Sequence, residues 1–226
     1  MVTVSRYQMK LSHSHSAITM YENCPLRYYR QRVLKEVKDE GNQYSVYGER
    51  IHEALEKRLR DQESLPKEAA HYEKLVCAIE SKIGDGTLMV EQQLTLTENL
   101  EPTEWFAPDA WLRSILDVLI LKGDTAIVMD WKTGRRKPDF EQLELFALQT
   151  WKHYPEVNTI KASFVWLKDM AMDSETYSRE DANDLWAKHM GRIRRIYESL
   201  EHDKWPARPS GLCRFCPCYS TCDYAK

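Results

Sequence analysis

The chain has 226 residues, 42% of them hydrophobic and 11% aromatic, so it is long enough to bury a core of its own. Its formal net charge of −3 argues against a uniformly basic nucleic-acid-binding surface, although local basic clusters stay compatible with such binding. No stretch approaches the roughly 18 apolar residues of a membrane span, and no apolar run near the N-terminus resembles a signal peptide. We therefore expect a cytoplasmic protein whose six cysteines are reduced and suit metal binding better than disulfides.

A first helix is predicted over residues 17–33, with Ser16 as its N-cap. Pro25 lies inside this segment, and proline breaks or kinks a helix there. Tyrosine and arginine side chains are interleaved along the helix, a mixture that suits base stacking and phosphate contact. An amphipathic helix with a solvated arginine face explains the same pattern, so the segment alone does not indicate nucleic-acid binding.

A second helix is predicted over residues 45–61, because apolar residues recur there at helical spacing. His52 borders this apolar stripe, where a lone histidine is more often structural than a metal ligand. A third helix is predicted over residues 67–83, with Cys77 as a small core residue. The stripe of the second helix consists of Ile51, Leu55 and Leu59.

Residues 115–132 are predicted to form a hairpin of two apolar strands joined by a Gly-Asp loop, in which glycine supplies the positive φ. Continuing this register places Asp117 directly opposite Asp130. Opposed side chains in an antiparallel pair have Cβ atoms roughly 4.5–5.5 Å apart, so two carboxylates there require a cation. Lys132 points to the same face as Asp130. The other face is apolar, with Leu116, Val118 and Ile120 against Ile127, Met129 and Trp131.

The remaining elements complete an alternation of strands and helices. This order predicts an α/β domain with a mixed sheet covered by helices on both faces. The predicted elements are a strand over 88–96 that contains Glu91, a helix over 139–152 with Asp139 as a possible N-cap, a strand over 159–167 and a long helix over 178–200.

The C-terminal segment concentrates cysteines. Four thiols within ten residues of a reduced protein indicate a metal centre, because free surface thiols are a reactivity liability. Spacing separates neither zinc from an iron–sulfur cluster nor the four ligands from the other cysteines. The C-terminal cysteines are Cys213, Cys216, Cys218 and Cys222, and the upstream ones are Cys24 and Cys77.

Taken together, these residues resemble the PD-(D/E)xK nuclease superfamily. Within it they look like the RecB-type branch that carries a [4Fe–4S] cluster, as in AddB nuclease domains, CRISPR-associated exonucleases and phage relatives. The resemblance covers residues 16–222, and two departures are Phe146 in place of a tyrosine and Cys218 as an extra cysteine. The matching motifs, in order, are Cys24-Pro25-x-x-Tyr28, Gly48-x3-His52, Asp117, Asp130-Trp131-Lys132, Gln142-x3-Phe146-Ala147 and Cys213-x2-Cys216-x5-Cys222.

The resemblance implies a restriction-endonuclease-like sheet in a single nuclease domain over residues 1–226. Residues 45–200 would form the catalytic core. Residues 16–33 and 205–226 would form a clasp that joins the two ends of the chain through a [4Fe–4S] cluster, with Zn²⁺ as the alternative. The ligands implied for this centre are Cys24, Cys213, Cys216 and Cys222.

The resemblance also implies a Mg²⁺ or Mn²⁺ site. His52, Asp117, Asp130 and the Trp131 carbonyl would hold the ion, which generates a more acidic water and neutralises phosphate charge. Lys132 would position or deprotonate the attacking water, or stabilise the transition state. The implied supporting residues are Gln142, which would orient the catalytic group or the DNA, Glu91, which is either a further acid or a solvent-facing strand residue, and Arg135, Arg136 and Lys137, which would grip phosphates.

The sequence therefore predicts a metal-dependent DNA exonuclease that acts in recombination, repair or phage or CRISPR DNA processing. No phosphate-binding loop of an ATPase is visible, so the protein would act alone or beside a helicase, recombinase or annealing protein. One alternative is an inactive nucleic-acid-binding or scaffold protein with a structural four-cysteine metal site. Another is an iron–sulfur electron-transfer protein, which would not require the two aspartates and the lysine.

Overall fold

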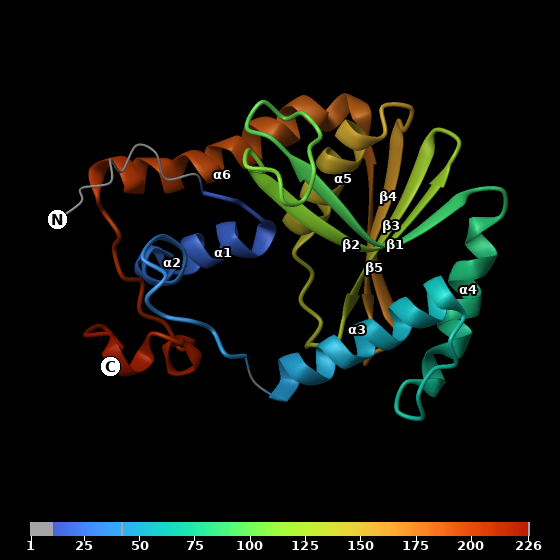
Figure 1. Cartoon of the computed structure of the whole chain (residues 1–226), viewed down its shortest axis with the longest axis horizontal. Coiled ribbons are helices and arrows are strands. Elements are labelled where there is room, and N and C mark those ends of the chain that lie inside the picture. Colours follow the sequence, from blue (N-terminus) through green and yellow to red (C-terminus); the bar gives the residue numbers. More distant parts are fainter. Residues whose placement is uncertain (1–10, 42, 226) are drawn as a thin grey trace. The chain divides into compact units, whose positions relative to one another are not determined.

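The computed structural model describes residues 11–41 and 43–225, and its central feature is a five-stranded sheet in the order β1-β2-β3-β4-β5 (Figure 1). β3 and β4 run parallel, and the other neighbours are antiparallel, so the predicted mixed sheet is confirmed. Packing divides the chain into two units, residues 42–185 and residues 1–41 with 186–226, and each is described by itself. The strands are β1 (Thr87–Leu96), β2 (Leu112–Lys122), β3 (Thr125–Lys132), β4 (Thr159–Trp166) and β5 (Ala171–Ser178).

The predicted hairpin is formed by β2 and β3. Lys122 pairs with Thr125 beside the two-residue loop, and the ladder continues to Val118 opposite Met129. Gly123 has a φ of +57°, the left-handed conformation that this loop requires and that glycine adopts without strain. The predicted register is therefore confirmed over the length of the ladder, which ends one residue before the position where the two aspartates would pair.

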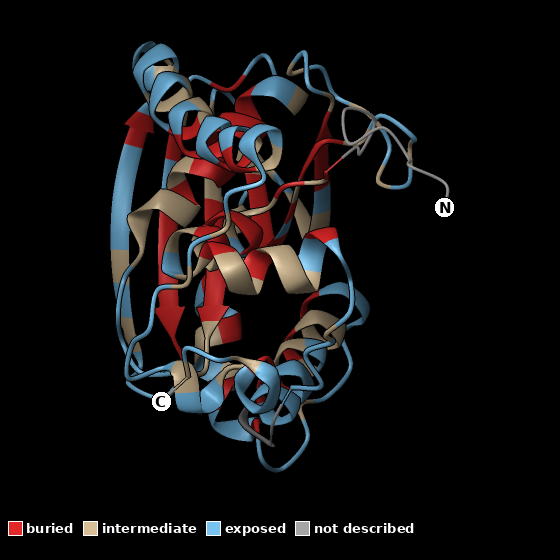
Figure 2. Cartoon of the chain, turned by 90° about the vertical axis from the view of Figure 1, so that its left-hand side faces the viewer, coloured by how far each residue is buried: buried red, intermediate tan, exposed pale blue. Residues whose placement is uncertain are grey.

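Helices cover both faces of the sheet in the unit of residues 42–185 (Figure 1). On one face, α3 and α4 bury a continuous apolar cluster with β2 and β3, and on the other face lies α5. Each fully buried Leu or Ile contributes roughly 1.5–3 kcal/mol. Figure 2 shows that the strands carry much of the buried surface, whereas the outer faces of the helices are exposed. The helices are α3 (Gln43–Asp61), α4 (Glu73–Ile83) and α5 (Phe140–His153), and the cluster includes Ile51, Leu55, Leu59, Val118, Ile120, Met129 and Trp131.

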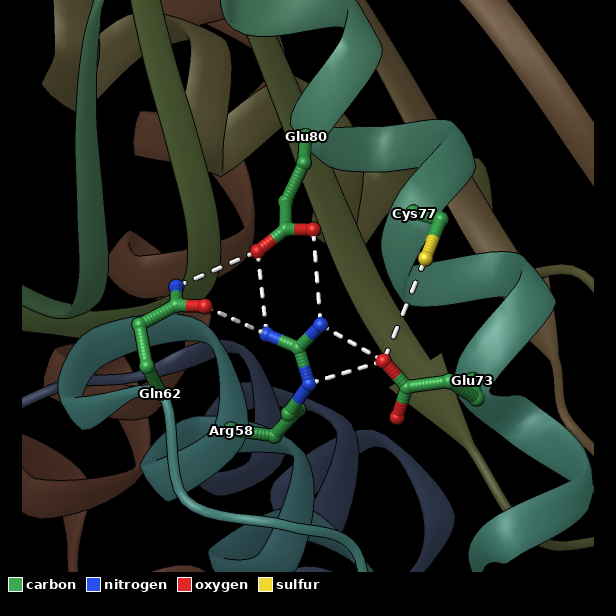
Figure 3. A network of polar contacts seen from close by, with 5 residues as sticks. All are labelled: Arg58, Gln62, Glu73, Cys77 and Glu80. Carbon is green, nitrogen blue, oxygen red and sulfur yellow. Dashed lines mark hydrogen bonds and ion pairs between the residues drawn. The ribbon is translucent and has the colours of Figure 1, made fainter.

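Arg58 joins α3 to α4 (Figure 3). Its guanidinium contacts Glu73 Oε1 at 2.5 Å and Glu80 Oε1 at 3.0 Å, and these contacts raise its pKa further. Cys77 lies on the same exposed surface, with its Sγ 3.9 Å from Glu73 Oε1. The prediction that Cys77 is a core residue is therefore wrong. Its neighbours Val76 and Ile79 occupy the buried face of α4 instead.

Part-way along β1 and β2, the side chains at alternate positions change from one face of the sheet to the other. Val118 packs with α3 and α4, yet Ser114, which simple alternation would place on the same face, hydrogen-bonds to Gln149 of α5. Between these two positions, Glu91 of β1 has a φ of +52°. Val90 pairs with Val118 and Gln92 pairs with Leu116, so the same register would place Glu91 opposite Asp117. These two residues do not form a ladder pair. A uniform strand pattern, as predicted from the sequence, does not anticipate this inversion.

The second unit begins with a helix that is broken at Cys24. The N-cap of α1 is Ser14, whose hydroxyl accepts a hydrogen bond from the Ala17 amide at 3.2 Å, so the prediction of Ser16 as N-cap is wrong. Cys24 is extended, and Pro25 starts the next helix at a position where its missing N–H is not needed. The elements are α1 (His15–Asn23), α2 (Pro25–Tyr28), a π-helical turn (Tyr29–Val33) and, from residue 186 onward, α6 (Ala182–His202).

Three further elements differ from the sequence prediction. β5 was not predicted, because it is an edge strand whose mostly exposed, polar residues give no apolar alternation. The third helix begins at Glu73 after a 3-10 turn, and the long helix begins at Ala182 after a turn capped reciprocally by Ser178 and Asp181. Asp139 is the N-cap residue of α5, but its side chain makes no capping hydrogen bond.

The helices of the described segments include none with the length and apolar character needed to cross a membrane. The expectation about the N-terminus concerns residues 1–10, which lie outside the described residues.

Candidate active site

α3 brings His52 to the end of the β2–β3 ladder. The apolar stripe of α3 faces the sheet, and His52 follows Ile51 of that stripe, so the imidazole lies beside the strands. Its Nδ1 is 3.5 Å from Asp117 Oδ1. One turn earlier, a Cβ on Gly48 would lie 2.9 Å from Thr133 Oγ1. Glycine at this position therefore allows α3 to approach the segment after β3.

Three potential metal ligands meet at this point: His52, Glu91 and Asp117. One ligand atom from each lies within 4.8 Å of the others. One imidazole nitrogen and two carboxylate oxygens suit a divalent cation that prefers oxygen and accepts imidazole, such as Mg²⁺ or Mn²⁺. The group opens into a cleft of about 570 Å³ lined by Ser45, Gly48, Glu49, His52, Glu53, Glu56, Glu91, Ile115, Asp117 and Thr133.

The pKa values of Glu91 and His52 are both raised in this group. Burial and, after it, the negative charges of Asp117 and Glu56 together raise the pKa of Glu91 to about 7. Burial alone would lower the pKa of His52, but its hydrogen bond and Coulomb attraction to Asp117 outweigh burial and raise it. Both shifts favour the protonated forms of Glu91 and His52, as expected where carboxylates share a space that a cation could neutralise.

Asp130, Lys132 and Gln142 form a second, closed group beside the first. Lys132 Nζ is 2.7 Å from Asp130 Oδ2 and donates to Gln142 Oε1 at 3.0 Å. Gln142 Nε2 donates to Asp130 Oδ1 at 2.8 Å. Each residue of this triangle thus contacts the other two, which fixes all three side chains. The ammonium of Lys132 also lies 5.1 Å from the ring centroid of Phe164.

Burial raises the pKa of Asp130 to about 6, although the ammonium of Lys132 opposes that rise. The negative charge of Asp117 adds to it, so the two aspartates are close enough to interact. The amide of Trp131 links them, because it donates to Asp117 Oδ2 at 2.6 Å. At the position where the predicted register would pair the two aspartates, the contact between the strands is thus this backbone–side-chain hydrogen bond and not a ladder pair.

α5 holds Gln142 in place because its other end is anchored to the sheet. Gln149 is fully buried and donates to the carbonyls of Leu94 and Leu112 at 3.1 and 3.3 Å, while accepting from Ser114. These contacts satisfy the buried amide and tie α5 to β1 and β2.

The basic loop after β3 is only partly available for phosphates. Arg136 makes a two-point contact with Asp173 of β5, which also accepts a hydrogen bond from Trp166 Nε1 at 2.7 Å. Arg135 and Lys137 are exposed. Of the three residues expected to contact phosphates, Arg136 is thus the one already paired with a carboxylate.

The structure groups the predicted site residues differently from the sequence. Glu91, whose role the sequence left open, is one of the three grouped ligand candidates, whereas Asp130 belongs to the Lys132–Gln142 triangle. Trp131 contributes its amide, and its side chain is in the core. Sequence analysis did not predict that Glu49 and Glu56 line the cleft. Their spacing from His52, three residues before and four after, places all three on one face of a helix.

The four predicted cluster ligands gather separately, in the unit of residues 1–41 and 186–226. They line a cavity of about 350 Å³ together with Cys218. Two of their sulfurs accept backbone hydrogen bonds: Cys24 Sγ from the Arg208 amide at 3.5 Å, and Cys213 Sγ from the Ser210 amide at 3.2 Å. Cys77 is not part of this cavity.

The family model of the PD-(D/E)XK nuclease superfamily matches residues 12–223. The chain belongs to this superfamily. Asp130-Trp131-Lys132, which the sequence analysis compared with the D-x-K motif, lies within the matched residues, on the strand where the Asp130–Lys132–Gln142 triangle is built. This match identifies the superfamily and not the RecB-type branch within it. No curated protein matches the sequence.

Solved structures with a similar fold include a protein assigned as an exonuclease from Eubacterium rectale. It is 13% identical with a TM-score of 0.56, and the match covers 97% of this chain and 92% of that one. An alkaline exonuclease from Laribacter hongkongensis is 12% identical with a TM-score of 0.31, covering 88% of this chain and 95% of that one. At these identities, the first likeness shows a shared fold, and the second is too distant to support an argument.

Proposed function

We propose that this protein is a metal-dependent nuclease that hydrolyses DNA phosphodiester bonds, acting from strand ends. The observation that carries the proposal is that two groups lie beside the end of the β2–β3 ladder: the ligand candidates His52, Glu91 and Asp117, and the Asp130–Lys132–Gln142 triangle. Superfamily membership supports a nuclease. The proposal of an exonuclease rests on the sequence resemblance and on the exonuclease activity assigned to the Eubacterium rectale protein.

His52, Glu91 and Asp117 would hold Mg²⁺ or Mn²⁺ through one nitrogen and two carboxylate oxygens. The cation supplies a more acidic water and neutralises charge that builds up on the phosphate. The Trp131 amide, by donating to Asp117 Oδ2, would leave Oδ1 to face His52 and the cation. Asp130 and the Trp131 carbonyl stay predicted as further ligands.

Lys132 would act on the water or on the phosphate. Its ammonium is held between Asp130 Oδ2 and Gln142 Oε1, so it is oriented before substrate arrives. From there it would hold the attacking water or stabilise negative charge on the phosphoryl oxygens. Gln142 would position Lys132 and Asp130 at once, because its amide accepts from one and donates to the other.

The test is digestion of end-labelled single- and double-stranded DNA with Mg²⁺ or Mn²⁺, comparing the native chain with Asp130→Ala. We expect metal-dependent release of short products from strand ends by the native chain and loss of at least about a hundredfold in rate for the variant, because electrostatic groups at a reaction centre are worth several kcal/mol. Absence of cleavage by both proteins would overturn the proposal, and products of internal cuts would overturn the exonuclease part.

The cysteine cavity suits a [4Fe–4S] cluster in this proposal. Amide hydrogen bonds to the sulfurs of Cys24 and Cys213 are of the kind that support cluster thiolates. Cys24, Cys213, Cys216 and Cys222 would ligate the cluster, or Zn²⁺ in its place, and its role would be to stabilise the fold. A cytoplasmic setting, and a helicase, recombinase or annealing protein as partner, stay predictions from the sequence.

A further inference from the structure

The C-terminal segment exposes a group of large apolar side chains that the proposed catalytic chemistry does not use. They lie on and around two 3-10 turns, Cys213–Phe215 and Tyr219–Thr221, of the unit that contains the cysteines. We call this group the C-terminal aromatic platform. It consists of Leu212, Phe215, Tyr219 and Tyr224, with exposed fractions of 66%, 70%, 50% and 58%.

Arginines lie around the platform, and two of them are already paired with carboxylates: Arg27 with Asp39, and Arg30 with Glu36. The guanidinium of Arg214 lies 4.8 Å from the ring centroid of Phe215. Leu212, Tyr219 and Tyr224 line the cysteine cavity with Arg27 and Arg208, and the described residues of that lining include no Asp or Glu. Arg30 reaches the second turn, where it donates to Thr221 Oγ1 at 2.7 Å. Arg208 and Arg214 are therefore the cations that favour an anionic ligand with flat apolar groups beside the exposed rings.

Single-stranded nucleic acid has this chemistry. Its unpaired bases stack on aromatic rings, while its phosphates are attracted to nearby arginines. In a duplex the faces of the bases are already stacked, so the exposed rings would gain little from it. We propose that the C-terminal aromatic platform binds single-stranded DNA, as a second DNA contact apart from the His52–Glu91–Asp117 group. The choice of DNA rests on the proposed function, whereas the strandedness rests on the aromatic rings.

The test is equilibrium binding of a fluorescent oligothymidylate without added divalent cation, so that no cleavage is needed for the readout. Phe215→Ala and Tyr219→Leu should each raise the Kd at least about fivefold, because stacking on one aromatic ring contributes about a factor of five or more. Tyr219→Phe should bind like the native chain, since it keeps the ring. Arg214→Gln should weaken binding and flatten its salt dependence.

Phe106→Ala is the matched control. Phe106 is 88% exposed but lies in the loop between β1 and β2, among Glu101, Glu104 and Asp109 and away from the cysteine segment in sequence. Its loss should leave the Kd unchanged. Equal binding by all variants, equal loss with Phe106→Ala, or competition by duplex as strong as by single strand would each overturn the inference. Cleavage is measured separately, so an inactive chain that still binds through the platform would overturn only the proposed function.

Unchanged melting temperatures and cysteine-dependent absorption will show that the variants are folded. If Phe215→Ala perturbs the turn, the two variants at Tyr219 still test the inference. Tyr219→Phe keeps an aromatic ring and Tyr219→Leu does not, so a higher Kd for Tyr219→Leu alone shows that the ring binds the strand.

Discussion

Glu91 has a left-handed backbone conformation in the middle of a strand, which costs a non-glycine residue of order 1–3 kcal/mol. It lies where the facing of β1 and β2 inverts, and its carboxylate meets His52 and Asp117. We predict that Glu91→Gln raises the Mn²⁺ concentration for half-maximal cleavage by about tenfold or more, because one of two grouped carboxylates is lost. Cleavage titrated with Mn²⁺ measures this.

Glu49→Gln is the control for that titration. Glu49 lines the same cleft and is also a glutamate, but it is not one of the three grouped residues. If both variants shift the metal requirement equally, then the general negative potential of the cleft, and not ligation by Glu91, accounts for the effect.

The raised pKa of Glu91 also predicts how stability depends on pH in the metal-free protein. A carboxyl with a pKa of 4.5 when unfolded and about 7 when folded contributes stability at low pH that is lost as the pH rises through 7. Glu91→Gln removes this loss. Its melting temperature relative to the native chain should therefore increase from pH 5 to pH 8, as measured by thermal scans after chelation. Saturating Mn²⁺ should reverse the order at pH 8, and a difference independent of pH would contradict the prediction.

At this scale, the register of the hairpin could be predicted, whereas the grouping of the site residues could not. The register followed from the Gly-Asp loop, and the ladder confirms it as far as Val118 opposite Met129. The role of Glu91 could not be decided, since it depends on a local φ that strand alternation does not contain. The contact between Arg136 and Asp173 could not be predicted either, because β5, which contains Asp173, was not predicted.

At the scale of elements, the position of α3 depends on one close approach. A methyl group on Gly48 would collide with Thr133 Oγ1 at 2.9 Å, so α3 or the segment after β3 would have to move. We predict that Gly48→Ala lowers both cleavage and stability, the latter by about 1–3 kcal/mol as for other overpacked sites. Adding Thr133→Ala should restore stability to at least the native value, because alanine is otherwise the better helix residue.

Urea unfolding of both single variants and the double variant measures this coupling. Additive effects would mean that the two residues do not compete for the same space. Cleavage should recover with stability if the displacement of His52 by α3 is the cause of its loss.

The junction of α3 and α4 provides the second test at this scale. Arg58 contacts two glutamates from α4 and is largely covered, whereas Arg60 forms an exposed pair with Glu56 within α3. Arg58→Ala should lower the melting temperature by at least about twice as much as Arg60→Ala, because exposed helical pairs contribute little and unpaired neighbouring carboxylates repel. Differential scanning fluorimetry at low and high salt measures both, and equal shifts would argue against Arg58 as the joint.

Elements with strong periodicity could be predicted, and those shaped by tertiary context could not. α3 follows from its Ile51–Leu55–Leu59 stripe. The break at Cys24 followed in outline from Pro25, but the sequence did not predict that Cys24 would be extended, which separates α1 from α2. That cysteine is thereby freed from helical geometry and lines the cavity with its distant partners.

At the scale of the whole molecule, residues near the two ends of the chain meet in one unit. Cys24 and the C-terminal cysteines line a single cavity, while residues 42–185 pack as a separate unit. In the proposed function, a bound metal centre would join these cysteines and contribute directly to the folding of this unit. Such a centre ties residues close to both ends, and losing one ligand should release this unit first.

We therefore predict that Cys213→Ser lowers the melting temperature and abolishes visible absorption, while Cys77→Ser, whose thiol is exposed outside the cavity, changes neither. Limited proteolysis followed by mass spectrometry should show early cuts in residues 203–225 of Cys213→Ser and a persistent fragment containing residues 42–185. Cys218→Ser decides the ligand set: if it keeps the absorption that Cys216→Ser loses, Cys216 is the ligand, and the reverse result would assign the extra cysteine to the centre. Native-like stability and protease resistance of Cys213→Ser would contradict a structural metal centre, because a cavity lined by five thiols would then hold its fold without one.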